Sequence, residues 1–175
     1  MDHTDVGLQA AVRALRDVVA PAVDPAHAQA RDQLRLTIDY LEFVRQRIDH
    51  LYARELFELR HHLGLARSLH AIAGPSGLPC AGLLAEAIAE GAAALAADHA
   101  PAAVLRSAAR ALAAAASEAV SASAGIEAGA RHAVEACVLE ASQARIAFER
   151  AWYLPLGLDA DAQEVKPLSE VLKSE

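Results

Sequence analysis

The chain has 175 residues, of which 54% are hydrophobic and only 4% aromatic, and its formal net charge at pH 7 is -7. A chain of this length can bury one substantial core, and its alanine-rich composition is typical of helices rather than strands. The acidic balance argues against a nucleic-acid partner, because binding to phosphates needs a basic face.

The two cysteines, Cys80 and Cys137, belong to no CxxC pattern, which gives no support to a zinc site or a disulfide framework. The first residues are acidic and lack the layout of a signal peptide, and no run approaches the ~18 uncharged apolar residues of a membrane span. We therefore expect a cytoplasmic protein with no membrane partner.

Helical periodicity is visible from the first residues onward. Leu8, Val12, Leu15 and Val19 recur at helical spacing, and the pattern stops at Pro21. Asp24 and Pro25 then form a strong start signal for a second helix, and no proline follows until Pro75. The sequence thus predicts an uninterrupted second helix of roughly 48 residues, about 70 Å long.

This second helix carries two apolar stripes. The first predicted stripe comprises Leu34, Ile38, Leu41, Ile48, Tyr52, Leu59 and Leu63. The second follows a strict heptad on nearly the opposite face, with Leu36, Phe43, His50, Phe57 and Gly64. Since one stripe suffices for a helix on the outside of a bundle, the second predicts a further neighbour. We interpret Leu36, Phe43, His50 and Phe57 as interface residues of a homodimer.

The remaining chain predicts two more helical segments. One starts at Pro79 and runs to about Ala97, with Gly91 in its apolar line indicating a close helix contact, and the other starts at Pro101 and runs to Trp152. An unbroken last helix would overshoot its neighbours by about 40 Å. Either it breaks near Ser121 to Gly125, or it stays whole and a second chain covers the overhang.

Large residues alternate with small ones along this last segment, beginning with Leu105, Ala109, Leu112 and Ala116. This alternation predicts a seam against which another helix packs closely. It continues across Gly125, which leaves both alternatives open.

These patterns together predict an all-α, up-and-down bundle of four long helices, with the last one divided or whole. Residues 1–153 are expected to form a single domain. Residues 154–175 change to an acidic, non-periodic composition, and we expect a loose arm that ends in a short helical turn.

A few polar side chains have the spacing of metal ligands. Glu58 and His61 match the Glu-x-x-His spacing of ferritin-like di-metal bundles, although the motif occurs only once. If the last segment folds back, His132 and Glu135 would come to a similar height, and His62 is adjacent. Glu58, His61, His62, His132 and Glu135 are therefore the candidate metal ligands, against the simpler interpretation of surface ion pairs.

A second group of polar residues flanks the main stripe. Arg45, Tyr52, Glu55 and His62 are expected to form a buried polar cluster. Such clusters more often fix the register of packed helices than perform acid-base chemistry.

The chain contains no nucleophile elbow, phosphate-binding glycine loop or His-Glu-x-x-His motif. We therefore predict a non-catalytic structural or protein-interaction module that forms a homodimer and needs no cofactor. The alternative is a bundle that binds a metal or small ligand in the service of an enzyme.

In general shape alone, the predicted bundle resembles the C-terminal helical domain of acyl-CoA dehydrogenases. Its alanine-rich helicity resembles phasins, which coat hydrophobic granules. No motif of either family is matched, and the abundant arginine disfavours a coat protein.

Overall fold

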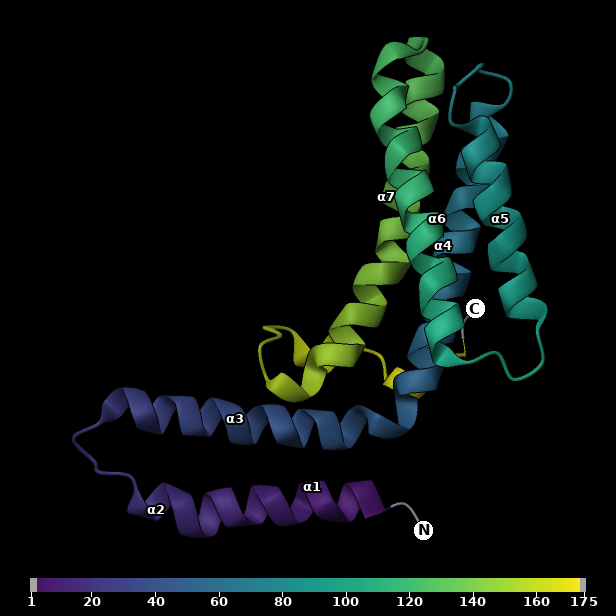
Figure 1. Cartoon of the computed structure of the whole chain (residues 1–175). Coiled ribbons are helices and arrows are strands. Elements are labelled where there is room, and N and C mark those ends of the chain that lie inside the picture. Colours follow the sequence, from purple (N-terminus) through teal and green to yellow (C-terminus); the bar gives the residue numbers. More distant parts are fainter. Residues whose placement is uncertain (1–2, 174–175) are drawn as a thin grey trace. The chain divides into compact units, whose positions relative to one another are not determined.

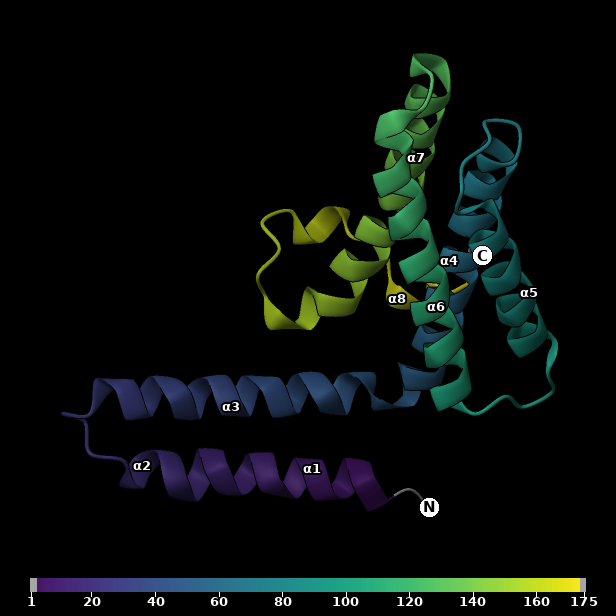
Figure 2. The same ribbon diagram turned by 45° about the horizontal axis from the view of Figure 1, so that its top comes forward.

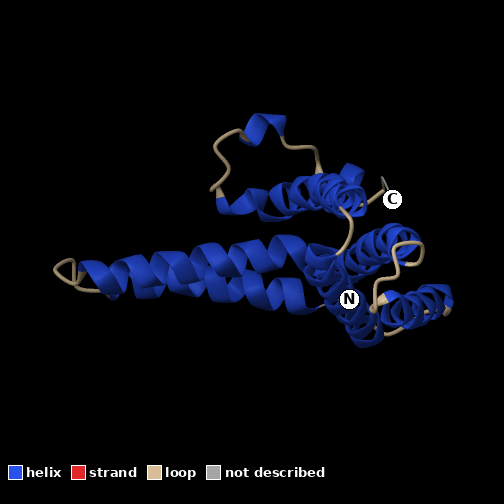
Figure 3. Ribbon diagram, turned by 90° about the horizontal axis from the view of Figure 1, so that it is seen from above, coloured by secondary structure: helices blue, strands red, loops and turns tan. Residues whose placement is uncertain are grey.

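The computed structural model describes residues 3–173, which form helices and loops without any strand (Figure 3). The predicted all-α fold is confirmed. Two compact units are present: unit 1 contains the described residues up to Leu51 together with Arg150–Val165, and unit 2 contains Tyr52–Glu149 together with the described residues from Lys166 onward. That residues 1–153 form a single domain stays a prediction. None of the helices described has the length and apolarity needed to span a membrane.

Unit 2 is built on four successive helices, which run alternately up and down (Figures 1 and 2). They are α4 (Leu51–Ala73), α5 (Ala81–Ala96), α6 (Ala102–Ala122) and α7 (Ala128–Tyr153). The loop between α4 and α5 holds Gly77 at φ 66°, a conformation that glycine adopts without strain. The predicted up-and-down bundle is therefore present within unit 2.

The last predicted helix is divided near Gly125, which is the first of the two predicted alternatives. A 3-10 turn, η3 (Ser123–Gly125), separates α6 from α7. The Ser123 hydroxyl donates to the Val120 carbonyl, and the Glu127 carboxylate accepts hydrogen bonds from the backbone N–H groups of Gly129 and Ala130. Those two N–H groups lower the pKa of Glu127, which caps the new helix. Local capping thus supports the chain reversal from α6 into α7.

Close packing of small residues forms the core of unit 2. The predicted seam on α6 is buried, with Leu105 and Leu112 completely inaccessible to solvent. Opposite it on α5, a Cβ atom placed on Gly91 would lie 2.7 Å from Leu112 Cδ1 and 3.6 Å from Leu59 Cδ1. A side chain at position 91 would require Leu112 to shift, so the predicted close contact at Gly91 is confirmed.

Unit 1 contains a helical hairpin. Its first arm is a continuous helix made of α1 (His3–Ala14), a π turn η1 (Leu15–Val19) and α2 (Ala20–Ala22), and its second arm is α3 (Ala28–Arg47). The π turn ends at Val19, two residues before Pro21, which has no N–H for the usual helical bond, and such a turn accommodates the missing donor. α1 lies antiparallel to α3 (Figures 1 and 2), and Arg45 joins them through Asp5 at 3.3 Å.

The predicted uninterrupted second helix is wrong, because a 3-10 turn, η2 (Ile48–His50), separates α3 from α4. At this point the Arg47 side chain turns to the end of α7. Its Nε donates to the Trp152 carbonyl at 2.8 Å, and its Nη2 donates to the Ala151 carbonyl at 3.1 Å. Carbonyls at a helix C-terminus lack intrahelical partners, so a guanidinium caps them well. Neither proline nor glycine marks the interruption, which explains why the sequence pattern missed it.

The C-terminal segment contains short helical turns, and its character as a loose arm stays a prediction. Two 3-10 turns, η4 (Leu154–Leu156) and η5 (Ala162–Glu164), precede α8 (Leu168–Val171), which is the expected terminal helical turn. Arg150 binds the Asp159 carboxylate through two hydrogen bonds of 2.8 and 2.9 Å, and this contact lowers the pKa of Asp159. A bidentate pair of this kind holds the loop in one conformation.

The close contact at Gly91 predicts that a large side chain there destabilises unit 2. We expect Gly91→Leu to reduce the free energy of unfolding by about 1–3 kcal/mol, because the core has no room for the new side chain. The measurement is urea unfolding followed by circular dichroism. Gly82→Leu on the same helix is the control, since a Cβ there meets no atom within 4 Å. Equal stability of the two variants would contradict the packing described.

Candidate functional site

The five predicted metal ligands are not gathered at one place. On α4, Glu58 Oε2 lies 3.6 Å from His62 Nε2, whereas His132 on α7 pairs with Glu135 at 3.9 Å. The His132 side chain is 84% exposed. Within residues 3–173, no group of three or more His, Cys, Asp or Glu side chains could hold a metal ion. His132 and Glu135 thus form a surface ion pair.

The partner that sequence reasoning missed is Arg145 of α7. Its Nη1 lies 2.9 Å from Glu58 Oε2 and 3.4 Å from His62 Nε2. His62 and Arg145 together lower the pKa of the Glu58 carboxyl, although burial opposes them. The only signal in the sequence is the spacing of Arg145 and Glu149, whose side chains also pair, at 3.1 Å. This network fastens α7 to α4.

The predicted buried polar cluster is dispersed over three places. Arg45 lies in unit 1, where it pairs with Glu42 at 2.9 Å in addition to Asp5. Tyr52 donates its hydroxyl to the Ala100 carbonyl, and Glu55 pairs with Arg106 at 2.7 Å. His62 belongs to the Arg145 network. Apart from the pair of Arg45 with Glu42, which lies within α3, these contacts join a helix to another helix or to a loop, which is a structural role.

The predicted interface residues differ in their accessibility. Phe43 packs between Tyr40, Trp152 and Tyr153 within unit 1, and its ring stacks on that of Tyr153 with centroids 5.7 Å apart. Phe57 stacks on Phe148 of unit 2 at 4.0 Å and is buried. Little of either phenylalanine ring is therefore accessible to another chain.

The two remaining members of the predicted interface are more accessible than the phenylalanines. His50 is half-buried, and Leu36 is half exposed. Of the four, Leu36 presents the clearest apolar surface.

His61 has an unusual environment for a polar side chain. The residue is only 8% exposed, and its ring stacks on Phe57 at 6.0 Å and meets the His62 ring edge-on at 5.2 Å. Among the described residues it has no hydrogen-bond partner. Burial, together with the nearby His62 and Arg145, lowers the pKa of His61, so its imidazole is neutral at pH 7. A neutral imidazole offers one donor and one acceptor.

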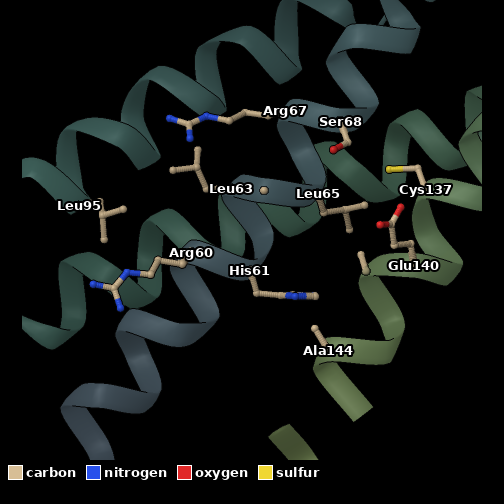
Figure 4. A pocket seen from close by; sticks show the side chains of 12 residues that line it. Arg60, His61, Leu63, Leu65, Arg67, Ser68, Leu95, Cys137, Glu140 and Ala144 are labelled. Atoms are coloured by element: carbon tan, nitrogen blue, oxygen red, sulfur yellow. The ribbon is translucent and has the colours of Figure 1, made fainter. Parts of the chain in front are cut away.

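The His61 ring borders a groove of about 590 Å³ in unit 2 (Figure 4). α4 contributes the face from Arg60 to Ser68, α5 contributes Leu95, and α7 contributes a row from Cys137 to Ala144. A Cβ atom on Gly64 would meet no atom within 4 Å, which leaves the middle of this face open. The groove combines apolar and polar side chains within the usual volume range of small-ligand sites, about 300–1,000 Å³.

Cys137 is the one thiol that borders this groove among the described residues. Burial raises its pKa, and a hydrogen bond with Ser68 opposes this effect only in part. A nucleophilic cysteine needs the opposite, a lowered pKa that generates the thiolate. The groove therefore has the features of a binding site rather than those of a cysteine-dependent active site.

Comparison of the chain with protein-family models, curated proteins and solved structures finds no match. Function must therefore be argued from the site itself.

The lowered pKa of His61 predicts a pH dependence of stability. The ordinary pKa of a histidine is 6.5. Between pH 6.5 and the lower folded-state pKa, the unfolded chain binds more protons than the folded chain. Stability is thus present above about pH 6.5 and declines as pH falls through the folded-state pKa. We expect His61→Phe, which keeps a ring beside Phe57, to remove up to about 1 kcal/mol of the decline between pH 7.5 and 5.

Urea unfolding at several pH values measures this decline. His132→Phe, at the exposed position on α7, controls for the loss of a histidine as such. A decline in His61→Phe as steep as in the unmodified protein would show that His61 does not resist protonation.

Proposed function

We propose that the protein is a non-catalytic interaction module that acts as a homodimer, and that unit 1 provides the dimer surface. The observation that carries this proposal is an uncovered apolar face on the hairpin of α1 and α3. Leu36 is 50% exposed and Tyr40 60% exposed, one turn apart on α3. Phe43 continues the same face, and its buried ring supports that of Tyr40 at 6.0 Å.

A two-helix hairpin buries little apolar surface by itself. Val12 and Ile38 are the large residues buried between the two arms, among those described. Two helices each bury one stripe and leave their outer faces to water, whereas two hairpins packed together form a four-helix bundle. A second copy would therefore supply the layer that one hairpin lacks.

The charges on α3 favour such a pairing. The whole chain carries a net charge of -7, so two copies repel one another in general. The sequence of α3 contains four arginines and three acidic residues, for a net charge of 4 - 3 = +1. Arg35 and Asp39 also form an ion pair at 3.3 Å, so neither presents a free charge. Two copies can thus approach along α3 without strong repulsion.

The same proposal includes a cytoplasmic location. Both cysteines are free, and Cys80 is buried, which suits a reducing compartment.

Charge substitutions on the exposed α3 face test the proposal. We expect the unmodified protein to have twice the mass of the 18.4 kDa chain by light scattering after size exclusion, and Leu36→Glu with Tyr40→Glu to have the mass of one chain. The reason is that the two introduced glutamates would lose their hydration if the interface formed, which destabilises the dimer. Circular dichroism checks that the variant is folded.

Leu139→Glu is the matched control, because Leu139 is 68% exposed on α7 of unit 2. This variant should stay dimeric. A monomeric unmodified protein, or a double variant that stays dimeric, would overturn the proposal.

A further inference from the structure

We propose that the groove centred on Gly64 in unit 2 binds an organic carboxylate with an apolar body. This site lies wholly within unit 2 and is independent of the homodimer proposed for unit 1.

The first observation is the imidazole of His61, which borders the groove. Its residue is more than nine-tenths buried, it borders the groove, and no described residue hydrogen-bonds to it. Figure 4 shows the ring extended from α4 toward Ala144 of α7. The fully buried nitrogen atoms without a partner in the described chain belong to other histidines, so the His61 ring nitrogens reach the open groove. A hydroxyl or carbonyl group on a ligand lying in the groove would provide one.

The helical geometry of α4 gives the groove two different walls. Arg60 and Arg67 lie seven residues apart on one side of Gly64, next to Leu95 of α5 (Figure 4). His61 and Ser68 lie on the other side, facing α7. Gly64 is the floor between the walls, and no atom fills the space above it.

The charges of the two walls favour an anion. Neither Arg60 nor Arg67 has an ion-pair partner among the described residues, whereas Arg106, Arg145 and Arg150 are each paired with a carboxylate. Glu140 is the one acidic residue that borders the groove, so the two guanidiniums leave a net charge of +1. Guanidinium groups bind carboxylates through two parallel hydrogen bonds.

The rest of the lining sets the character of the ligand body. Leu63, Leu65 and Leu95 supply apolar side chains, and Ala141 and Ala144 of α7 add small ones. These surfaces suit an aliphatic or aromatic body. A metal ion does not fit, because no metal-binding group of side chains is present in the described part of the chain.

Isothermal titration calorimetry of the full-length protein tests the site with three probes that differ in their head group: octanoate, 1-octanol and octylammonium. We expect saturable binding of octanoate with one site per chain, and binding of octylammonium at least about tenfold weaker. Absence of saturable octanoate binding, or equal affinity for the anion and the cation, would overturn the proposal.

Two sets of variants locate the site. Gly64→Leu should weaken octanoate binding at least about tenfold by filling the floor, whereas Gly82→Leu, an equally unobstructed glycine outside the groove, should change it less than about twofold. Arg60→Gln with Arg67→Gln should abolish the preference for octanoate over 1-octanol.

Each variant leaves the core residues in place, so we expect each to fold like the unmodified protein. Circular dichroism checks this. Octanoate affinity in Gly64→Leu equal to that of the unmodified protein would show that the ligand binds elsewhere.

Discussion

The close approach of α5 and α6 at Gly91 is the constraint on which unit 2 depends. With 4% aromatic residues, the chain has few large side chains to fill space between helices. A core of leucine and alanine reaches the packing density of a protein interior only if the helix backbones come close. Gly91 permits this, because Leu112 of α6 occupies the place where its side chain would be. α4 then lays Leu59 and Leu63 on the same core.

α4 also borders the groove, through residues between Arg60 and Ser68. The network of Glu58, His62 and Arg145 fastens α7 to this helix, while Phe57 and Phe148 stack beside it. These contacts lie in the first half of α4 and leave the face around Gly64 open. The same arrangement explains how His61 is buried without a partner: aromatic rings cover its faces, and the groove lies at its edge.

Helical periodicity and start signals predicted the fold class, the buried seam on α6 and the tight contact at Gly91, because these depend on local spacing. The interruption at Ile48–His50 escaped prediction, since it involves contacts of Arg47 with residues about a hundred positions away. Cross-helix partners escaped for the same reason: Arg145 meets Glu58 only after the chain reverses at η3. The heptad of Leu36, Phe43, His50 and Phe57 was a real pattern, but it crosses η2, so Phe43 and Phe57 pack in different units.

We propose that a second copy covers the apolar face on the hairpin of unit 1. Amide hydrogen exchange at two protein concentrations, well below and well above the dimer dissociation constant, tests this directly. We expect slower exchange along α3 at the higher concentration and unchanged exchange in α5 and α6 of the unit 2 core. Exchange along α3 that is independent of concentration across that range would contradict it.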